Sequence, residues 1–162
     1  MTLNQEQIMN YFTRIGLNYD DYKCHKLDGQ LLAKLCFAHN ISIPFENLDI
    51  LNHKMISLDG SILYDKIITK HRGGLCFELN GLSEIFLRSL GFGVKDLSSR
   101  FFRDAGDDIP MQRHRLLKVE AVDGTYIWDI GIGQRSPKYP LRLAEGLVQK
   151  QCGEVYKLEK EA

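Results

Sequence analysis

The clearest structural signal in the sequence is residues 72–91, RGGLCFELNGLSEIFLRSLG. Apolar residues recur here at helical spacing, so they form one stripe along a helix that Gly91 ends. The stripe consists of Leu75, Leu79, Leu82, Phe86 and Leu90. Gly73 and Gly74 come directly before the helix and let the backbone turn sharply. The sequence therefore predicts a tight turn that leads into a helix with one buried face.

Two further helices are predicted upstream of this turn. Asn4 and Gln7 have the spacing of a capping box, and apolar residues then recur at helical spacing as far as Gly16. A second helix is expected to begin near Asp28. Its buried side carries Leu31, Leu32, Leu35 and Cys36.

The pattern changes to strands after Gly91. Residues 115–122 and 125–128 are strand-like, and Asp123-Gly124 between them is typical of a two-residue hairpin turn. Residues 98–113 carry few signals and are expected to form a long loop or a bulged strand. Helices first and strands afterwards predict an α+β fold. We expect a helical domain over residues 1–92 and a strand domain over residues 93–162.

Composition excludes several classes of protein. Lys plus Arg and Asp plus Glu are 21 each, so nothing favours a broad nucleic-acid surface. We find no apolar stretch long enough to span a membrane and no export signal at the start. The four cysteines are therefore expected to be reduced thiols in a cytoplasmic protein. Cys36 and His39 alone do not make a zinc site, so we expect no metal.

Cys76 is the candidate nucleophile. The glycine turn puts it in the first turn of the predicted helix, where unpaired N–H groups and the helix dipole favour a thiolate. The same N–H groups are suited to binding an oxyanion. From local spacing alone, however, a glycine turn followed by a buried structural cysteine is the more frequent arrangement.

His114 and Asp129 are candidates for the base and the acceptor that a cysteine nucleophile needs. A hairpin centred on Asp123-Gly124 pairs Asp129 with Lys118. Asp129 then shares a face with His114 but lies four residues away along the strand, too far for contact in a regular hairpin. A bulge, a shifted turn or a strongly curled sheet is needed to bring the pair together.

Four motifs in order resemble the arylamine N-acetyltransferase family. Residues 43–49, 72–80, 114–117 and 126–133 are similar to the V-P-F-E-N-L, R-G-G-x-C-x-E-x-N, H-x-L-L and D-V-G-F-G segments of that family. The resemblance as a whole extends over nearly the entire chain, from Asn4 to about Leu158. The resemblance implies a cysteine-protease-like Cys-His-Asp core, with a helical bundle followed by an antiparallel barrel.

The resemblance also implies a ping-pong acetyl transfer. Cys76 takes acetyl from acetyl-CoA as a thioester, His114 keeps Cys76 ionised and later deprotonates the amine, and Asp129 orients the imidazole. The acceptor is an arylamine, an arylhydrazine or an N-hydroxyarylamine. The expected substrate-binding residues are Phe45, Pro110, Arg113, Gly131, Ile132 and Gly133. No metal, nucleic acid or membrane is implied.

Several polar residues near these motifs are expected to support the nucleophile loop rather than to react. They are Glu46, Asn47, Arg72, Glu78 and Asn80, which we interpret as a buried hydrogen-bonded network. Tyr126 and Trp128 are interpreted as core residues on one strand face. Ile132 and Arg135 depart from the family pattern, and their chemistry suggests a different choice of acceptor.

The chain stops well before the usual length of the family. The expectation is an incomplete barrel, with the usual third α/β domain absent and exposed strand edges that favour an oligomer. Two alternatives remain at this stage. One is a cysteine hydrolase or amide synthase with the same three residues. The other is an inactive module that pairs with a full-length relative.

Overall fold

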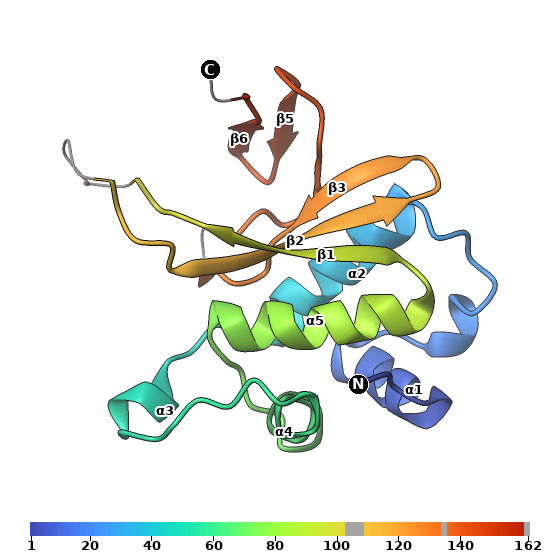
Figure 1. Cartoon of the computed structure of the whole chain (residues 1–162). Helices are drawn as coiled ribbons and strands as arrows, with labels where there is room; N and C mark the ends of the chain where they lie inside the picture. Colours follow the sequence, from blue (N-terminus) through green and yellow to red (C-terminus); the bar gives the residue numbers. More distant parts are fainter. Residues whose placement is uncertain (103–108, 134–135, 161–162) are drawn as a thin grey trace.

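The computed structural model describes residues 1–102, 109–133 and 136–160. Its helical elements are α1 (Gln5–Arg14), the 3₁₀ turn η1 (Tyr19–Asp21), α2 (Gly29–Ser42), α3 (Leu48–Leu51), α4 (Gly60–Tyr64), the π-helix η2 (Asp65–Thr69) and α5 (Cys76–Leu90). Its strands are β1 (Gly93–Ser99), β2 (His114–Ala121), β3 (Gly124–Trp128), β4 (Leu141–Arg142), β5 (Val148–Gln151) and β6 (Glu154–Lys157). This order of elements confirms the predicted α+β class (Figure 1).

Local capping signals set the ends of the main helices, as predicted. Asn4 and Gln7 make both hydrogen bonds of a capping box at the start of α1. The Asp28 carboxylate accepts from the Leu31 N–H at 2.9 Å and begins α2. At the end of α5, Gly91 adopts the left-handed conformation with φ of +103°.

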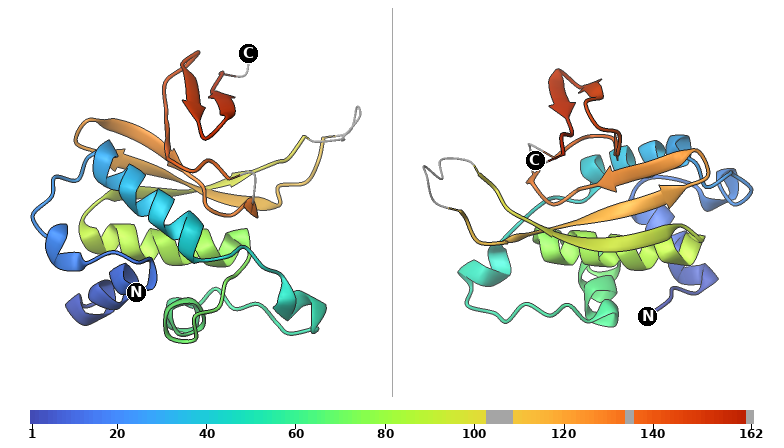
Figure 2. Two further views of the ribbon diagram at one scale, coloured as in Figure 1. Left: turned by 180° about the vertical axis from the view of Figure 1, so that it is seen from behind. Right: turned by 45° about the horizontal axis from the view of Figure 1, so that its top comes forward.

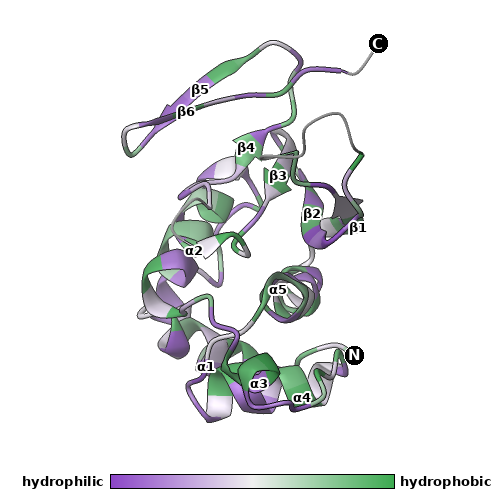
Figure 3. Cartoon of the chain, turned by 90° about the vertical axis from the view of Figure 1, so that its left-hand side faces the viewer, coloured by the Kyte–Doolittle hydropathy of each residue, from purple (hydrophilic) through white to green (hydrophobic). Residues whose placement is uncertain are grey.

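Helix α5 lies at the centre of the molecule, between β1 and β2 on one side and α1 and α4 on the other (Figure 3). Leu79, Leu82 and Phe86 of the predicted stripe are buried, whereas Leu75 and Leu90 at its two ends are half-buried. The stripe therefore faces the core along most of its length, and this burial fixes the helix that begins at Cys76.

One apolar core runs from the helices into the sheet. Leu117, Val119 and Trp128 of the strands belong to the same cluster of buried residues as the α5 stripe. The burial of Trp128 confirms its interpretation as a core residue, and Tyr126 is half-buried against the same cluster. The division into domains of residues 1–92 and 93–162 stays a prediction.

The strands form an open sheet rather than a closed barrel. Four antiparallel strands lie in the order β1-β2-β3-β4, and β5 pairs only with β6 among the described residues. Figure 2 shows the β5–β6 hairpin standing apart from the larger sheet. A barrel needs its first and last strands to pair. The prediction was an incomplete barrel, and the described strands indeed do not close; they form an open four-stranded sheet and a separate two-stranded hairpin.

The hairpin between β2 and β3 differs from the prediction in its register. Lys118 pairs with Ile127 and Ala121 with Gly124, so the two loop residues are Val122 and Asp123 instead of Asp123-Gly124. The turn also makes a tertiary contact. The Asp123 carboxylate accepts the Gly29 N–H at 2.9 Å, which fixes the turn to the start of α2.

The weakly patterned segment begins as strand β1, whose last residue, Ser99, pairs with His114. The rest of residues 98–113 carries no helix or strand where it is described, and 103–108 lie outside the described ranges. In the part of the chain that is described, no helix has both the length and the apolar character needed to cross a membrane.

Candidate active site

Cys76 is the first residue of α5 and is half-buried. Its Sγ lies 3.9 Å from the carbonyl oxygen of Arg113, the residue before β2. The preceding turn is held by two backbone hydrogen bonds, from Glu46 N–H to the Gly74 carbonyl and from Gly74 N–H to the Pro44 carbonyl. The glycine turn thus places the thiol at a helix N-terminus, facing the segment that enters β2.

His114 and Asp129 form a buried hydrogen-bonded pair. His114 Nε2 lies 2.7 Å from Asp129 Oδ2, and the two side chains are 2% and 5% exposed. His114 begins β2, and Asp129 follows the last residue of β3. The structure therefore brings together two residues that a regular hairpin centred on Asp123-Gly124 keeps apart.

The shifted turn explains how this pair meets. Leu117 pairs with Trp128, so the next residue, Asp129, comes opposite Leu116 rather than opposite Lys118. Asp129 then lies two residues from His114 along the strand instead of four. At about 3.3 Å per residue, this halves the separation along the strand and allows a direct contact.

The environment of His114 favours its protonated form. Burial by itself lowers the pKa of His114, but the hydrogen bond to Asp129 and the interaction with the Cys76 thiol outweigh it and raise the pKa to about 9. His114 Nδ1 is buried and has no hydrogen-bond partner in the described part of the chain. The imidazole is thus held as a cation beside the thiol at neutral pH.

Asp129 is itself held by the nucleophile helix. Its Oδ1 accepts the Asn80 side-chain N–H at 3.3 Å and the Gly131 N–H at 3.0 Å. Asn80 also donates to the Arg115 carbonyl at 2.6 Å. These bonds join α5, β2 and the segment after β3 around one carboxylate.

Gly131 and Gly133 place the segment after Asp129 against two other site residues. A Cβ atom on Gly131 would lie 2.6 Å from the Cα of Cys76, so only glycine fits there. Gly133 has φ of +70° and faces the Phe45 ring. Phe45, Gly133 and Ile130 line a shallow pocket of about 280 Å³.

The other predicted substrate-binding residues lie on the two segments that flank the thiol. Ile132 is half-buried, and its N–H donates to Ser136 Oγ at 2.8 Å. Pro110 is half-buried and Arg113 is exposed, both before β2. Gln134 and Arg135, where the sequence predicts an added charge, lie outside the described residues.

Phe101 is a site residue that sequence reasoning missed. Its ring centroid lies 4.8 Å from that of His114, and the side chain is exposed on its other side. The sequence signal that could have identified it is the adjacent aromatic pair Phe101 and Phe102 in an otherwise polar segment. Phe101 forms an aromatic wall beside the imidazole.

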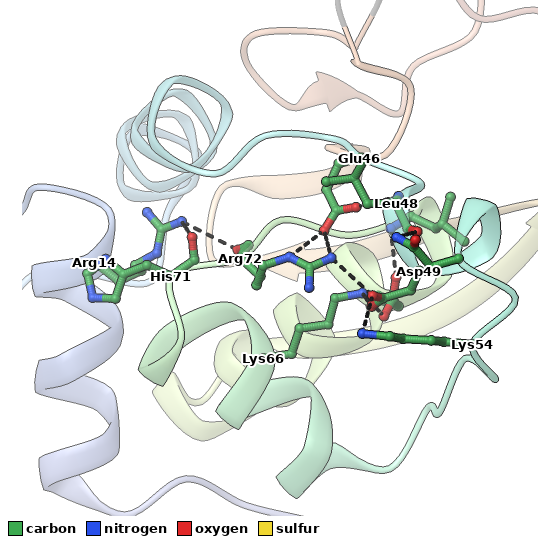
Figure 4. A network of polar contacts seen from close by, with 11 residues as sticks. Arg14, Glu46, Leu48, Asp49, Lys54, Lys66, His71 and Arg72 are labelled. Atoms are coloured by element: carbon green, nitrogen blue, oxygen red, sulfur yellow. Dashed lines mark hydrogen bonds and ion pairs between the residues drawn. The ribbon is translucent and has the colours of Figure 1, made fainter.

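Part of the predicted polar network around the nucleophile loop forms (Figure 4). Glu46, Arg72 and Glu78 are joined through two further members, whereas Asn80 bonds to Arg115 and Asp129 instead. The Arg72 guanidinium donates to Glu46 at 2.6 Å and to Asp49 at 3.2 Å. Lys66 lies 2.7 Å from both Asp49 and Glu78. Asp49 and Lys66 were not predicted members, and they connect the two halves of the network.

Two predicted members of the network differ in their burial. Glu78 is buried, and its second carboxylate oxygen accepts the Leu75 N–H at 2.9 Å, which caps the start of α5. Asn47 is exposed and makes no capping hydrogen bond at the start of α3, so the prediction of a buried Asn47 was wrong. It precedes a single exposed helical turn, which leaves its side chain in solvent.

No group of three or more His, Cys, Asp or Glu side chains within the described ranges is arranged to hold a metal ion. Cys36 and His39 are both buried in α2, and His39 Nδ1 is hydrogen-bonded to Tyr11 at 3.0 Å. The site is thus built from a thiol, an imidazole, a carboxylate and aromatic side chains.

Comparison with known proteins identifies the family. A family model described as N-acetyltransferase matches residues 28–162. The arylamine N-acetyltransferase / N-hydroxyarylamine O-acetyltransferase of Salmonella typhimurium is 42% identical over 132 residues, which is 82% of this chain and 47% of that protein. The chain belongs to the arylamine N-acetyltransferase family.

Solved structures of arylamine N-acetyltransferases have the same fold. The enzyme from Salmonella typhimurium superposes with a TM-score of 0.89 at 36% identity, covering 100% of this chain and 57% of that one. The Mycobacterium marinum enzyme in complex with CoA gives a TM-score of 0.85 at 34% identity, covering 95% and 57%. The chain spans about half the length of the curated relatives it matches.

Proposed function

We propose that this protein transfers acetyl from acetyl-CoA to arylamines, arylhydrazines or N-hydroxyarylamines through an acetyl-cysteine. The observation that carries the proposal is the buried His114–Asp129 pair, joined at 2.7 Å and interacting with the half-buried Cys76 thiol at the start of α5. Cys76, His114 and Asp129 act as a catalytic triad. The names of the similar enzymes and the CoA bound to one of them support this choice of substrates.

In the first half-reaction, the Cys76 thiolate attacks the thioester carbonyl of acetyl-CoA. A sulfur–carbon bond forms to Cys76, and the bond between the acetyl carbon and the coenzyme sulfur breaks. His114, protonated at neutral pH because of Asp129, gives a proton to the leaving coenzyme thiolate. The product is a thioester, which remains activated toward nitrogen.

In the second half-reaction, the amine nitrogen attacks the acetyl-Cys76 carbonyl. Neutral His114 accepts the proton that the nitrogen loses, and the bond to Cys76 Sγ breaks to restore the thiolate. An arylamine is weakly basic, so it remains neutral and nucleophilic at pH 7. Both tetrahedral intermediates carry an oxyanion, which the first-turn N–H groups of α5 at Cys76 and Phe77 are suited to bind.

The acceptor site is proposed to lie between Phe45, the segment 131–133 and the residues before β2, Pro110 and Arg113. A Cβ atom on Gly131 would meet Cys76 at 2.6 Å and one on Gly133 would meet Phe45 at 3.6 Å, which supports the packing of this segment between the nucleophile residue and the aromatic ring. Ile132 offers a branched aliphatic side chain to the acceptor, at the position of the phenylalanine in the D-V-G-F-G segment that the sequence resembles. We also retain a cytoplasmic location and association through open sheet edges as predictions.

The test of the proposed function is intact-mass measurement after mixing the protein with acetyl-CoA. We expect the mass to rise by one acetyl group in the wild type and in Cys152→Ser, which removes an exposed free thiol. In Cys76→Ser the adduct should be absent or greatly reduced. An adduct that persists at full level in Cys76→Ser would overturn the proposal.

Adding an arylamine then separates the proposed function from its alternatives. Loss of the adduct with formation of an N-acetylarylamine is the expected result. Release of acetate alone indicates the cysteine hydrolase, for which water replaces the amine. No adduct at all indicates the inactive module. Either of these outcomes contradicts N-acetyl transfer by this chain.

A further inference from the structure

Arg115 connects the helix that carries Cys76 to the strand that carries His114. Its Nη1 donates to the Phe77 carbonyl at 3.3 Å, and its Nη2 donates to the Glu84 carboxylate at 2.6 Å, both on α5. Its Nε donates to Asp96 of β1 at 2.8 Å. One guanidinium therefore links three elements, with a side chain that is only 15% exposed.

The surface of α5 is shaped to receive this guanidinium. Gly81 lies between Phe77 and Glu84, and a Cβ atom there would lie 2.6 Å from Arg115 Nη1. Real Cβ atoms do not approach a nitrogen so closely, so a side chain at this position displaces the guanidinium. Glycine within a helix costs about 1 kcal/mol relative to alanine. The close approach of Arg115 is a physical reason for glycine at this position.

The backbone of Arg115 makes a second link to α5. Its carbonyl accepts the Asn80 side-chain N–H at 2.6 Å, and the same Asn80 nitrogen lies 3.3 Å from Asp129 Oδ1. Arg115 directly follows His114, and Phe77 directly follows Cys76. The Arg115–Phe77 hydrogen bond thus links the side chain of the residue after His114 to the backbone of the residue after Cys76.

We propose that Arg115 is a positioning residue that fixes the separation between the Cys76 thiol and the His114 imidazole. This inference rests on the proposed function, because it concerns the same thiol and base. Arg115 touches neither reacting group. It acts through the bonds that hold α5 against β2.

Removing the guanidinium should weaken the thiolate–imidazolium pair more than it weakens the fold. A gap between α5 and β2 reduces the attraction between the two charges, since this attraction depends on distance and on exclusion of water. Three charged side chains face the guanidinium and the imidazole, namely Glu84 from α5, Asp96 from β1 and Asp129 after β3. All three remain in an Arg115 variant.

Arg88 provides a matched control at the far end of the same helix. Its Nε donates to Glu84 at 3.0 Å, and its Nη2 donates to the Val94 carbonyl of β1. Arg88 therefore also joins α5 to the sheet, through the Val94 carbonyl, but about three turns away from Cys76. A variant at this position tests whether loosening the helix from the sheet far from Cys76 also slows the alkylation of Cys76 at pH 7.

The experiment measures the rate of Cys76 alkylation by iodoacetamide at pH 7 and at pH 10. In Arg115→Met we expect roughly a tenfold loss of rate at pH 7. The rate at pH 10 should stay within about twofold, because thiols ionise there without an imidazolium. Arg88→Met should keep the wild-type ratio of the two rates. In Arg115→Lys the ratio of the rate at pH 7 to that at pH 10 should lie between those of the wild type and Arg115→Met. Lysine keeps the charge but cannot reach both the Phe77 carbonyl and the Glu84 carboxylate.

Gly81→Ala is a second variant in case Arg115→Met does not fold. Alanine favours the helix, yet its Cβ displaces the guanidinium, so the ratio should fall as in Arg115→Met. An unchanged ratio in a folded Arg115→Met or Gly81→Ala protein would overturn the inference. If Cys76 of the wild type is alkylated no faster than a free thiol at pH 7, the proposed function itself is contradicted.

Discussion

Burial and hydrogen bonding act in opposite directions on His114. Transfer of an imidazolium from water to an apolar site is costly, but Asp129 and the Cys76 thiol both favour the cation, and the pKa rises to about 9. The ordinary value for histidine is about 6.5. His114 is therefore more strongly protonated in the folded protein than in the unfolded chain.

This difference makes the stability of the protein depend on pH. The contribution of the raised pKa is fully present below pH 6.5 and is lost as the pH rises through about 9. Asp129→Asn removes the carboxylate that raises the pKa. We expect it to cost up to about 3 kcal/mol in the free energy of unfolding at pH 6, and much less at pH 9.5.

Urea unfolding of both proteins at these two pH values measures the effect. The quantity to follow is the difference between wild type and Asp129→Asn, because it removes the contribution of other titrating groups. A difference that stays constant from pH 6 to pH 9.5 would show that Asp129 does not hold the proton on His114.

Sequence motifs were enough to select the residues that carry the reacting groups of the site. They did not identify all the residues that contact and position those groups. Cys76, His114 and Asp129 were selected by their types, their order and the resemblance of the surrounding motifs to the family, and in the structure His114 contacts Asp129 and interacts with Cys76. Phe101 and Lys66 were missed because their roles come from contacts with residues far along the chain. The pair Phe101-Phe102 marks an aromatic patch in a polar segment, but neither this pair nor a lysine before two isoleucines indicates which distant side chain it contacts.

At the level of elements, the β2–β3 hairpin shows why register was harder to predict than helices. Capping residues and helical periodicity act within a few residues, so the starts of α1, α2 and α5 and the end of α5 followed from the sequence. The hairpin turn instead depends on the hydrogen bond between Asp123 and the Gly29 N–H, 94 residues apart. Because the resulting register brings Asp129 near His114, a tertiary contact at the turn determines the geometry at the site.

Asp123→Ala tests this role of the turn. The variant loses two hydrogen bonds to the carboxylate, from Gly29 N–H and from the Tyr126 hydroxyl. We expect a loss of about 1 kcal/mol per bond in the free energy of unfolding. The pKa of His114, followed by NMR titration, should also fall toward its ordinary value, because the hairpin can then adopt the register that separates it from Asp129.

Asp123→Asn is the matched control for this prediction. Asparagine keeps an oxygen that accepts the Gly29 N–H and is equally suited to a turn. Its stability and the pKa of His114 should stay closer to wild type than those of the alanine variant. An alanine variant that matches wild type in both measurements would mean that the strands alone determine the register.

At the scale of the whole molecule, the helices and the larger sheet share one core. The buried faces of α5 and β2 are in the same apolar cluster, and no second cluster separates the two halves within the described residues. A shared core favours a single cooperative unfolding transition, since neither half keeps its apolar face covered without the other. The division into domains near residue 92 stays a prediction, and the cooperativity of unfolding is the measurement that tests it.

Two core substitutions test this cooperativity. Leu82→Ala in α5 and Leu117→Ala in β2 each remove a fully buried side chain, and each should cost about 2–5 kcal/mol. Far-ultraviolet circular dichroism reports mainly on the helices, and the fluorescence of Trp128, the single tryptophan, reports on the sheet. Both probes should give the same unfolding midpoint in each variant. If Leu82→Ala lowers the midpoint seen by circular dichroism and leaves that of Trp128 unchanged, residues 1–92 and 93–162 unfold as separate domains.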